Sequence, residues 1–138
     1  MSENDSVGMI RQGLEELEKI YSEEKGGKEP EISAIKDERE RIKNLSERLE
    51  DLSDKDTVSS VKEFADRQIK ILEIISDKID RFESEDKESL AEHEHSQRHG
   101  SIGIIGGIIQ YSVYLTDEED QKEDLEEKMS EIKSYASS

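Results

Sequence analysis

The chain has 138 residues, of which 37 are aspartate or glutamate and 20 are lysine or arginine, so its formal net charge is −17. This charge argues against binding to double-stranded nucleic acid, because neutralising phosphates requires clustered cations. The absence of cysteine excludes a disulfide framework, and no apolar stretch reaches the roughly 18 to 20 residues of a membrane-spanning helix. The first residues lack the features of a signal peptide, so we expect an intracellular, cytoplasmic protein.

The apolar residues are few, but they recur at regular spacing among the acidic residues. Charged residues form 41% of the chain and apolar residues only 30%, a balance that in a less regular sequence would indicate disorder. Here the spacing predicts ordered helices whose outer faces are acidic and solvated. Adaptation to high salt and recognition of a basic partner are two further explanations of the same charge.

The first apolar stripe has steps of three and four residues, which are typical of a helix packed against another helix. It consists of Val7, Ile10, Leu14, Leu17 and Tyr21. The stripe predicts a helix over residues 7–24 that Gly26-Gly27 terminates. A second stripe with the same steps predicts a helix over residues 31–53. The polar break at residues 53–57 is short, so we expect the helices on either side of it to be antiparallel.

The third predicted helix, over residues 57–83, has the widest apolar stripe. A wide stripe contacts more than one neighbour, so this helix is expected at the centre of the bundle. Gln68 lies on its apolar seam and is interpreted as a polar residue that sets the register or that lies near an edge of the bundle. After a polar stretch at residues 83–88, helical structure is expected to continue to residue 99 and to stop at Gly100.

Residues 101–115 form the only continuous apolar segment, and three structures suit it. A β-hairpin turning at Gly106-Gly107 is preferred, because β-branched and aromatic residues follow the turn. A short buried helix would use Gly103 and Gly107 as a close-contact face. An interfacial membrane anchor is the third structure, which the acidic residues after the segment disfavour. Thr116 to Glu119 read as a capping box that starts a separate last helix, with a thin apolar stripe.

This apolar segment is the predicted association surface, because in all three structures it is too apolar to be left in water. Its contacts would join copies of this chain or a different protein partner. The predicted interaction residues are Ile102, Ile104, Ile105, Gly106, Gly107, Ile108, Ile109, Tyr111, Val113 and Leu115.

The three histidines lie close together, at residues 93–99. On a helix, Glu92, His95 and His99 would be one turn apart on the same face and could present three ligands to zinc or nickel. The preferred interpretation is an exposed, polar helix end at which His95, Arg98 and His99 interact with the C-terminal dipole.

The sequence therefore predicts a mainly α protein, an antiparallel helical bundle or coiled coil with a short apolar element before the last helix. The expected division is an acidic helical bundle over residues 1–99, an apolar glycine-rich element over 100–116, and a C-terminal helix and tail over 117–138. The expected function is a non-enzymatic interaction or assembly protein, with no nucleic acid, small-molecule substrate or cofactor. A small metal-binding protein and a peripheral membrane component are the alternatives.

Overall fold

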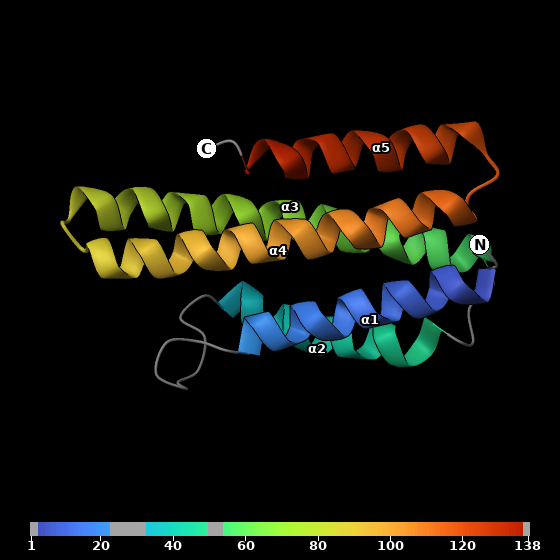
Figure 1. Cartoon of the computed structure of the whole chain (residues 1–138), viewed down its shortest axis with the longest axis horizontal. Helices are drawn as coiled ribbons and strands as arrows, with labels where there is room; N and C mark the ends of the chain where they lie inside the picture. Colours follow the sequence, from blue (N-terminus) through green and yellow to red (C-terminus); the bar gives the residue numbers. More distant parts are fainter. Residues whose placement is uncertain (1–2, 23–32, 50–53, 137–138) are drawn as a thin grey trace.

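The computed structural model describes residues 3–22, 33–49 and 54–136, and over these ranges it contains five helices and no strand (Figure 1). The predicted mainly helical bundle is thereby confirmed. The polar stretch at residues 83–88 contains the turn between α3 and α4. The helices are α1 (Glu3–Ser22), α2 (Ser33–Arg48), α3 (Asp54–Ser84), α4 (Glu88–Leu115) and α5 (Glu119–Ser134). The helix break expected at Gly26-Gly27 lies outside the described residues, and residues 54–57 already belong to α3.

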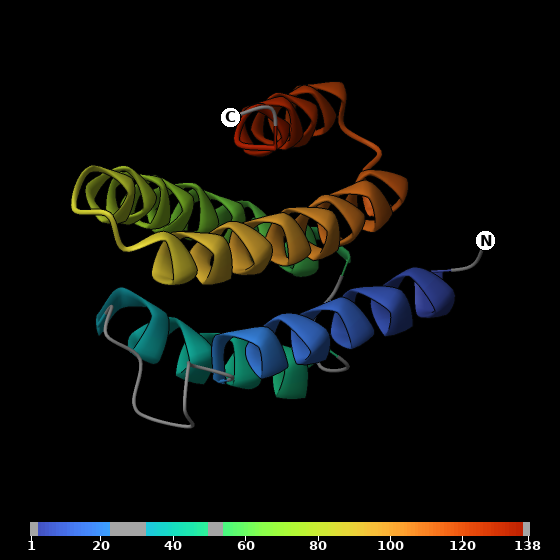
Figure 2. The ribbon, with the colours of Figure 1, turned by 60° about the vertical axis from the view of Figure 1, so that its left-hand side comes forward.

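The central helix of the bundle is α4, which packs against α1, α3 and α5. Figure 2 shows α1 and α2 on one side of the α3–α4 pair and α5 on the other. The helix predicted over residues 57–83 does contact several neighbours, because α3 packs against α2, α4 and α5, but α4 shares the middle of the bundle with it. The reason is that the second half of α4 has no charged residue and is apolar around most of its circumference, and such a helix is buried on several sides.

The apolar stripes of the first three predicted helices form most of the core. In α1, the side chains of Ile10, Leu14, Leu17 and Tyr21 are fully buried. Four further apolar positions widen the stripe of α3: Phe64 and Ile71 are buried, Ile69 is partly buried, and Ile74 is 41% exposed. The three-four spacing therefore identified which side of each helix faces its neighbours.

Residues 101–115 are helical and form the second half of α4, so the preferred hairpin is wrong. The helix also passes Gly100 without a break, so the helix stop expected there is wrong. Glycines each destabilise a helix by about 1 kcal/mol relative to alanine. Burial of each isoleucine on the inner face contributes about 1.5 to 3 kcal/mol and outweighs that loss. A hairpin would also need a partner strand or helix for its stability.

Thr116 ends α4 instead of starting α5, so the predicted capping box is wrong. Its hydroxyl donates a hydrogen bond to the Ser112 carbonyl at 3.0 Å, and its backbone N–H donates to Val113. The N-cap of α5 is Glu118, which makes no capping hydrogen bond through its side chain. The thin stripe expected for the last helix is confirmed, with Leu125 and Ile132 fully buried.

The turn between α3 and α4 is a Schellman motif. The Lys87 N–H donates to the Phe82 carbonyl at 2.9 Å, and the Asp86 N–H donates to the Glu83 carbonyl at 3.3 Å. Asp86 occupies the left-handed position of this motif with φ of 58°, where glycine is the usual residue. The turn brings α4 back alongside α3, and the two helices remain in contact.

Candidate functional site

The structure places most of the predicted interaction residues inside the bundle. Six of the ten are buried, and they are Ile102, Ile105, Ile108, Ile109, Val113 and Leu115. Ile104, Gly106, Gly107 and Tyr111 remain partly exposed. The apolar segment is thus shielded mainly by α1, α3 and α5 of the same chain. Only its outer side is accessible to a partner.

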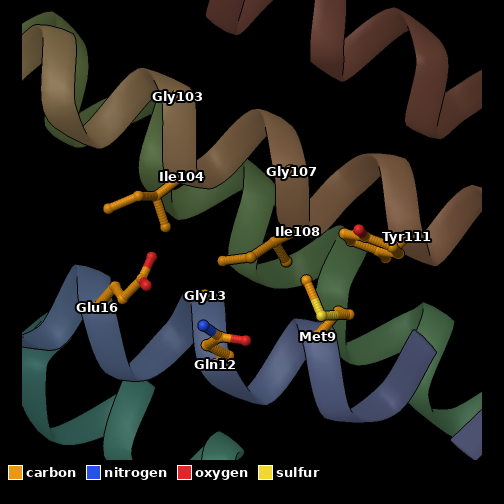
Figure 3. A pocket seen from close by; sticks show the side chains of 9 residues that line it. All are labelled: Met9, Gln12, Gly13, Glu16, Gly103, Ile104, Gly107, Ile108 and Tyr111. Carbon is orange, nitrogen blue, oxygen red and sulfur yellow. The ribbon is translucent and has the colours of Figure 1, made fainter. Parts of the chain in front are cut away.

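That outer side forms one wall of a groove between α1 and α4, with a volume of about 310 Å³ (Figure 3). The α4 wall consists of Gly103, Ile104, Gly107, Ile108 and Tyr111. The α1 wall consists of Met9, Gln12, Gly13 and Glu16. Glu16 lies at the Ile104 end of the groove and Met9 lies at the Tyr111 end.

Gly13 allows the two walls to approach closely at the floor of the groove. A Cβ atom at this position would lie 2.7 Å from Cγ1 and 3.2 Å from Cδ1 of Ile108. Both distances are shorter than an ordinary contact between carbon atoms. Gly13 is therefore required by the packing of α1 on α4.

The glycines on the α4 wall have a different environment. A Cβ atom at Gly103 or Gly107 would meet no atom within 4 Å. Packing within this chain therefore does not require glycine at either position, although each glycine weakens the helix. What the two glycines do provide is a smooth, open wall on the outer side of α4.

Few charges line the groove, although charged residues form 41% of the chain. Among the described residues that line it, only Glu16 carries a charge. Beyond the groove, Tyr111 is followed one turn later by Tyr114, whose ring centroid lies 6.2 Å from that of Tyr111. Tyr114 is 62% exposed. Tyrosine and methionine with few charges are the typical composition of the centre of a protein interface.

No protein-family model, curated protein or solved structure matches this chain. The geometry and chemistry of its own side chains are therefore the basis for a proposed function.

The structure does not bring the predicted metal ligands together. Glu92 and His99 are exposed, whereas both ring nitrogens of His95 are engaged. Its Nε2 lies 3.0 Å from Glu83 Oε1, and its Nδ1 lies 3.3 Å from Arg98 Nη2. Among the described residues, no three histidine or carboxylate side chains form a group that could hold a metal ion. The preferred alternative is also wrong, because these residues lie within α4 and not at a helix C-terminus.

A buried polar network connects α1, α2 and α3. The Tyr21 hydroxyl donates to Gln68 Oε1 at 2.6 Å, and Gln68 Nε2 donates to Glu38 Oε1 at 3.0 Å. Arg67 Nε lies 3.0 and 3.1 Å from the two oxygens of Glu38. Burial raises the pKa of Glu38, although the neighbouring guanidinium of Arg67 opposes this shift. Gln68 is fully buried on its seam and links Tyr21 of α1 to Glu38 of α2 through two hydrogen bonds.

A second pocket, of about 270 Å³, lies between α2 and α3 and is more polar. It contains the guanidinium groups of Arg41 and Arg67, which would suit an anionic ligand. However, Arg67 is paired with Glu38, and its Nη1 lies 3.1 Å from Glu63 Oε1. Two carboxylates thus balance the two guanidinium groups, so this pocket is less favourable for an anion than its arginines suggest.

Sequence reasoning missed the α1 wall of the groove and the exposed Tyr114. The available signal was Gly13, which stands inside a strongly periodic helix where a glycine often indicates a close approach. Met9 and Gln12 carry no such signal, because they lie off the apolar stripe of α1. None of the helices that the structure describes combines the length and the apolar character needed to cross a membrane.

Proposed function

We propose that the protein is a non-enzymatic helical interaction module that binds an α-helix of a partner protein in the groove between α1 and α4. In this proposal the five helices form an antiparallel bundle. The inner side of α4 packs in the core, and its outer side contacts the partner. The observation that carries it is the almost uncharged groove, with Tyr111 in its wall, on a molecule with a net charge of −17.

The shape of the groove favours a helix as its occupant. From Gly103 to Tyr114, α4 rises by about 17 Å, which is roughly three turns. A partner helix lying along this length would seat its side chains between the two walls, in the helix-in-groove mode of recognition. The missing side chains at Gly103 and Gly107 allow the backbone of the partner to come closer than at other positions on α4.

Charge favours a different protein over a second copy of this chain. Two copies would each bring a net charge of −17 to the interface, and the repulsion would oppose association at low and moderate salt. A partner with fewer negative charges meets no such barrier. The self-association that the sequence left open is therefore the less favoured form of the proposal.

The test uses the full chain and a synthetic amphipathic helical peptide with leucines on one face and equal numbers of lysine and glutamate on the other. We expect amide chemical shifts to change along residues 9–16 and 103–114 on titration. A Gly107→Leu variant, which fills the groove, should lose these changes. A Gly106→Leu variant should retain them, because Gly106 lies outside the groove and a Cβ there also meets no atom within 4 Å.

Circular dichroism establishes that both variants are folded. Equal peptide binding by the two variants, or chemical-shift changes confined to other helices, would overturn the proposal. Sedimentation velocity adds a second measurement. A wild-type dimer that Gly107→Leu dissociates would show that a second copy occupies the groove, and it would also overturn the choice of a different partner.

A further inference from the structure

The link between α4 and α5 contains no strong helix breaker. α4 ends at Leu115 and α5 begins at Glu119, and residues 116–118 between them are threonine, aspartate and glutamate. Glycine and proline are the residues that usually stop a helix, and neither occurs in the link. The Thr116 hydroxyl still donates to the Ser112 carbonyl at 3.0 Å, one turn back in α4. The local sequence therefore does not explain why α4 and α5 are two helices.

The break also leaves backbone N–H groups without a partner in a helix. The first helical hydrogen bond of α5 joins the Lys122 N–H to the Glu118 carbonyl at 3.0 Å, and Glu118 makes no capping bond through its side chain. The N–H groups of residues 119–121 therefore have no acceptor within α5. In a continuous helix they would bond to the carbonyls of residues 115–117. The break must be stabilised by contacts outside the link.

α5 lies against α3 and α4 (Figure 1) and packs on them through a thin apolar stripe. Leu125 and Ile132 are its buried residues, and Met129 is partly buried. By comparison, α1 on the other side of the α3–α4 pair buries four apolar side chains completely. Because the hydrophobic contribution grows with the apolar area buried, α5 is held less strongly than α1.

Two ion pairs connect α5 to α3, and both are open to solvent. Lys62 Nζ lies 3.1 Å from Asp124 Oδ2, and Lys128 pairs with Asp66. The side chains of the two carboxylates are 52% and 58% exposed, so water and salt screen the attraction. These pairs fix where α5 lies along α3 but add little to the free energy of docking.

We infer that α5 is a detachable helix, which leaves the α3–α4 pair while the rest of the bundle stays folded and then continues α4 as one straight helix. In that form Ser134 would lie about 28 Å beyond Leu115. The apolar stripe of α5 and the surface of α3 and α4 beneath it would both become accessible. This conformational change concerns the side of the bundle away from α1, and it does not depend on the function proposed above.

The chain contains no cysteine, so single introduced cysteines can report each opening in the full chain through their rate of thiol labelling. Ile132→Cys reports the detachment of α5. Leu14→Cys, at a fully buried position in α1, reports opening of the bundle. With each rate divided by that of the same variant unfolded in urea, Ile132→Cys should be labelled more than about tenfold faster than Leu14→Cys. Equal rates would mean that α5 opens only when the bundle unfolds, which would overturn the inference.

Substitutions in the link, made in the Ile132→Cys chain, test the continuous helix. Asp117 is exposed, and Asp117→Ala should raise the labelling rate about threefold, because alanine favours a helix more than aspartate does. Asp117→Pro fits the break, since Thr116 before it is already extended, but it disrupts a helix through the link. Its labelling should be at least about tenfold slower than that of Asp117→Ala. The matched control, Glu119→Ala, removes the same charge at an exposed residue that is helical in both forms, and it should change the rate less than about twofold.

Equal labelling of Asp117→Ala and Asp117→Pro would show that no continuous helix forms, and the inference would be wrong. The same two substitutions in the Leu14→Cys chain measure the stability of the bundle and should leave its labelling rate unchanged. Parallel changes at both cysteines would also contradict the inference, because they would come from global unfolding. None of these outcomes bears on docking in the groove between α1 and α4, which Gly107→Leu tests separately.

Discussion

Replacing glycine with alanine should have opposite effects on the two walls of the α1–α4 groove. At Gly103, a Cβ atom meets nothing within 4 Å, so Gly103→Ala should stabilise the protein by about 1 kcal/mol through helix propensity alone. At Gly13, the same gain is opposed by a Cβ atom 2.7 Å from Ile108 Cγ1. Overpacking of a rigid core generally destabilises by about 1 to 3 kcal/mol.

The net effect of Gly13→Ala should therefore be destabilisation by about 1 kcal/mol, so the two alanine variants differ by about 2 kcal/mol. Urea unfolding followed by circular dichroism resolves this difference. The denaturant midpoints should move in opposite directions, while the m-value stays constant. Thermal unfolding should show the same order, with shifts of a few degrees, roughly 2 to 5 °C for each kcal/mol in a chain of this length.

A double-mutant cycle with Ile108→Ala identifies the atoms responsible. Ile108→Ala alone should destabilise the protein by about 2 to 5 kcal/mol, because the side chain is fully buried. The double variant with Gly13→Ala and Ile108→Ala should be destabilised less than the sum of the two single variants, by about 1 kcal/mol or more of the free energy of unfolding. The reason is that the new methyl group no longer meets Cγ1. The reasoning is refuted if Gly13→Ala stabilises the protein as much as Gly103→Ala does, or if the two sites show no coupling.

Three further predictions concern charge and the backbone. Because burial raises the pKa of Glu38, its carboxylate takes up a proton at a higher pH in the folded state than in the unfolded chain. Lowering the pH from 7 toward the ordinary pKa of a glutamate should therefore raise the free energy of unfolding of the wild type relative to that of Glu38→Gln, as measured by urea titrations. A wild type that loses stability relative to Glu38→Gln as the pH falls would contradict the raised pKa. Asp86→Gly should stabilise the α3–α4 turn by about 0.5 to 1 kcal/mol, because glycine adopts the left-handed conformation without the steric penalty of a side chain; no change in the urea midpoint would contradict it. Raising the salt concentration from about 0.01 to 0.1 M shortens the Debye length from about 30 to about 10 Å and so weakens the repulsion within a chain of net charge −17. Calorimetry should therefore show a higher melting temperature. A lower melting temperature would mean that attractive ion pairs outweigh the repulsion.

The groove could be predicted only in part. The sequence predicts that the apolar segment at residues 101–115 is an association surface, and Ile104, Gly107 and Tyr111 of this segment line the groove. The opposite wall was not predicted, because Met9, Gln12 and Glu16 lie on the outer side of α1, where polar and apolar residues are equally tolerated. Which residues of α1 face α4 depends on the way the two helices cross, and local spacing does not contain that information.

The local pattern alone determined that the chain is helical and which side of most helices is buried. The reason is that the three-four spacing of apolar residues depends only on the local sequence of each helix. Whether residues 101–115 form a hairpin or a helix depended on tertiary structure, because several neighbouring helices bury the isoleucines and offset the helix-weakening effect of the glycines. Tertiary structure also determined the role of each glycine. Gly13 and Gly107 are the same residue in similar helices, but only at Gly13 does another helix come close enough to exclude a side chain.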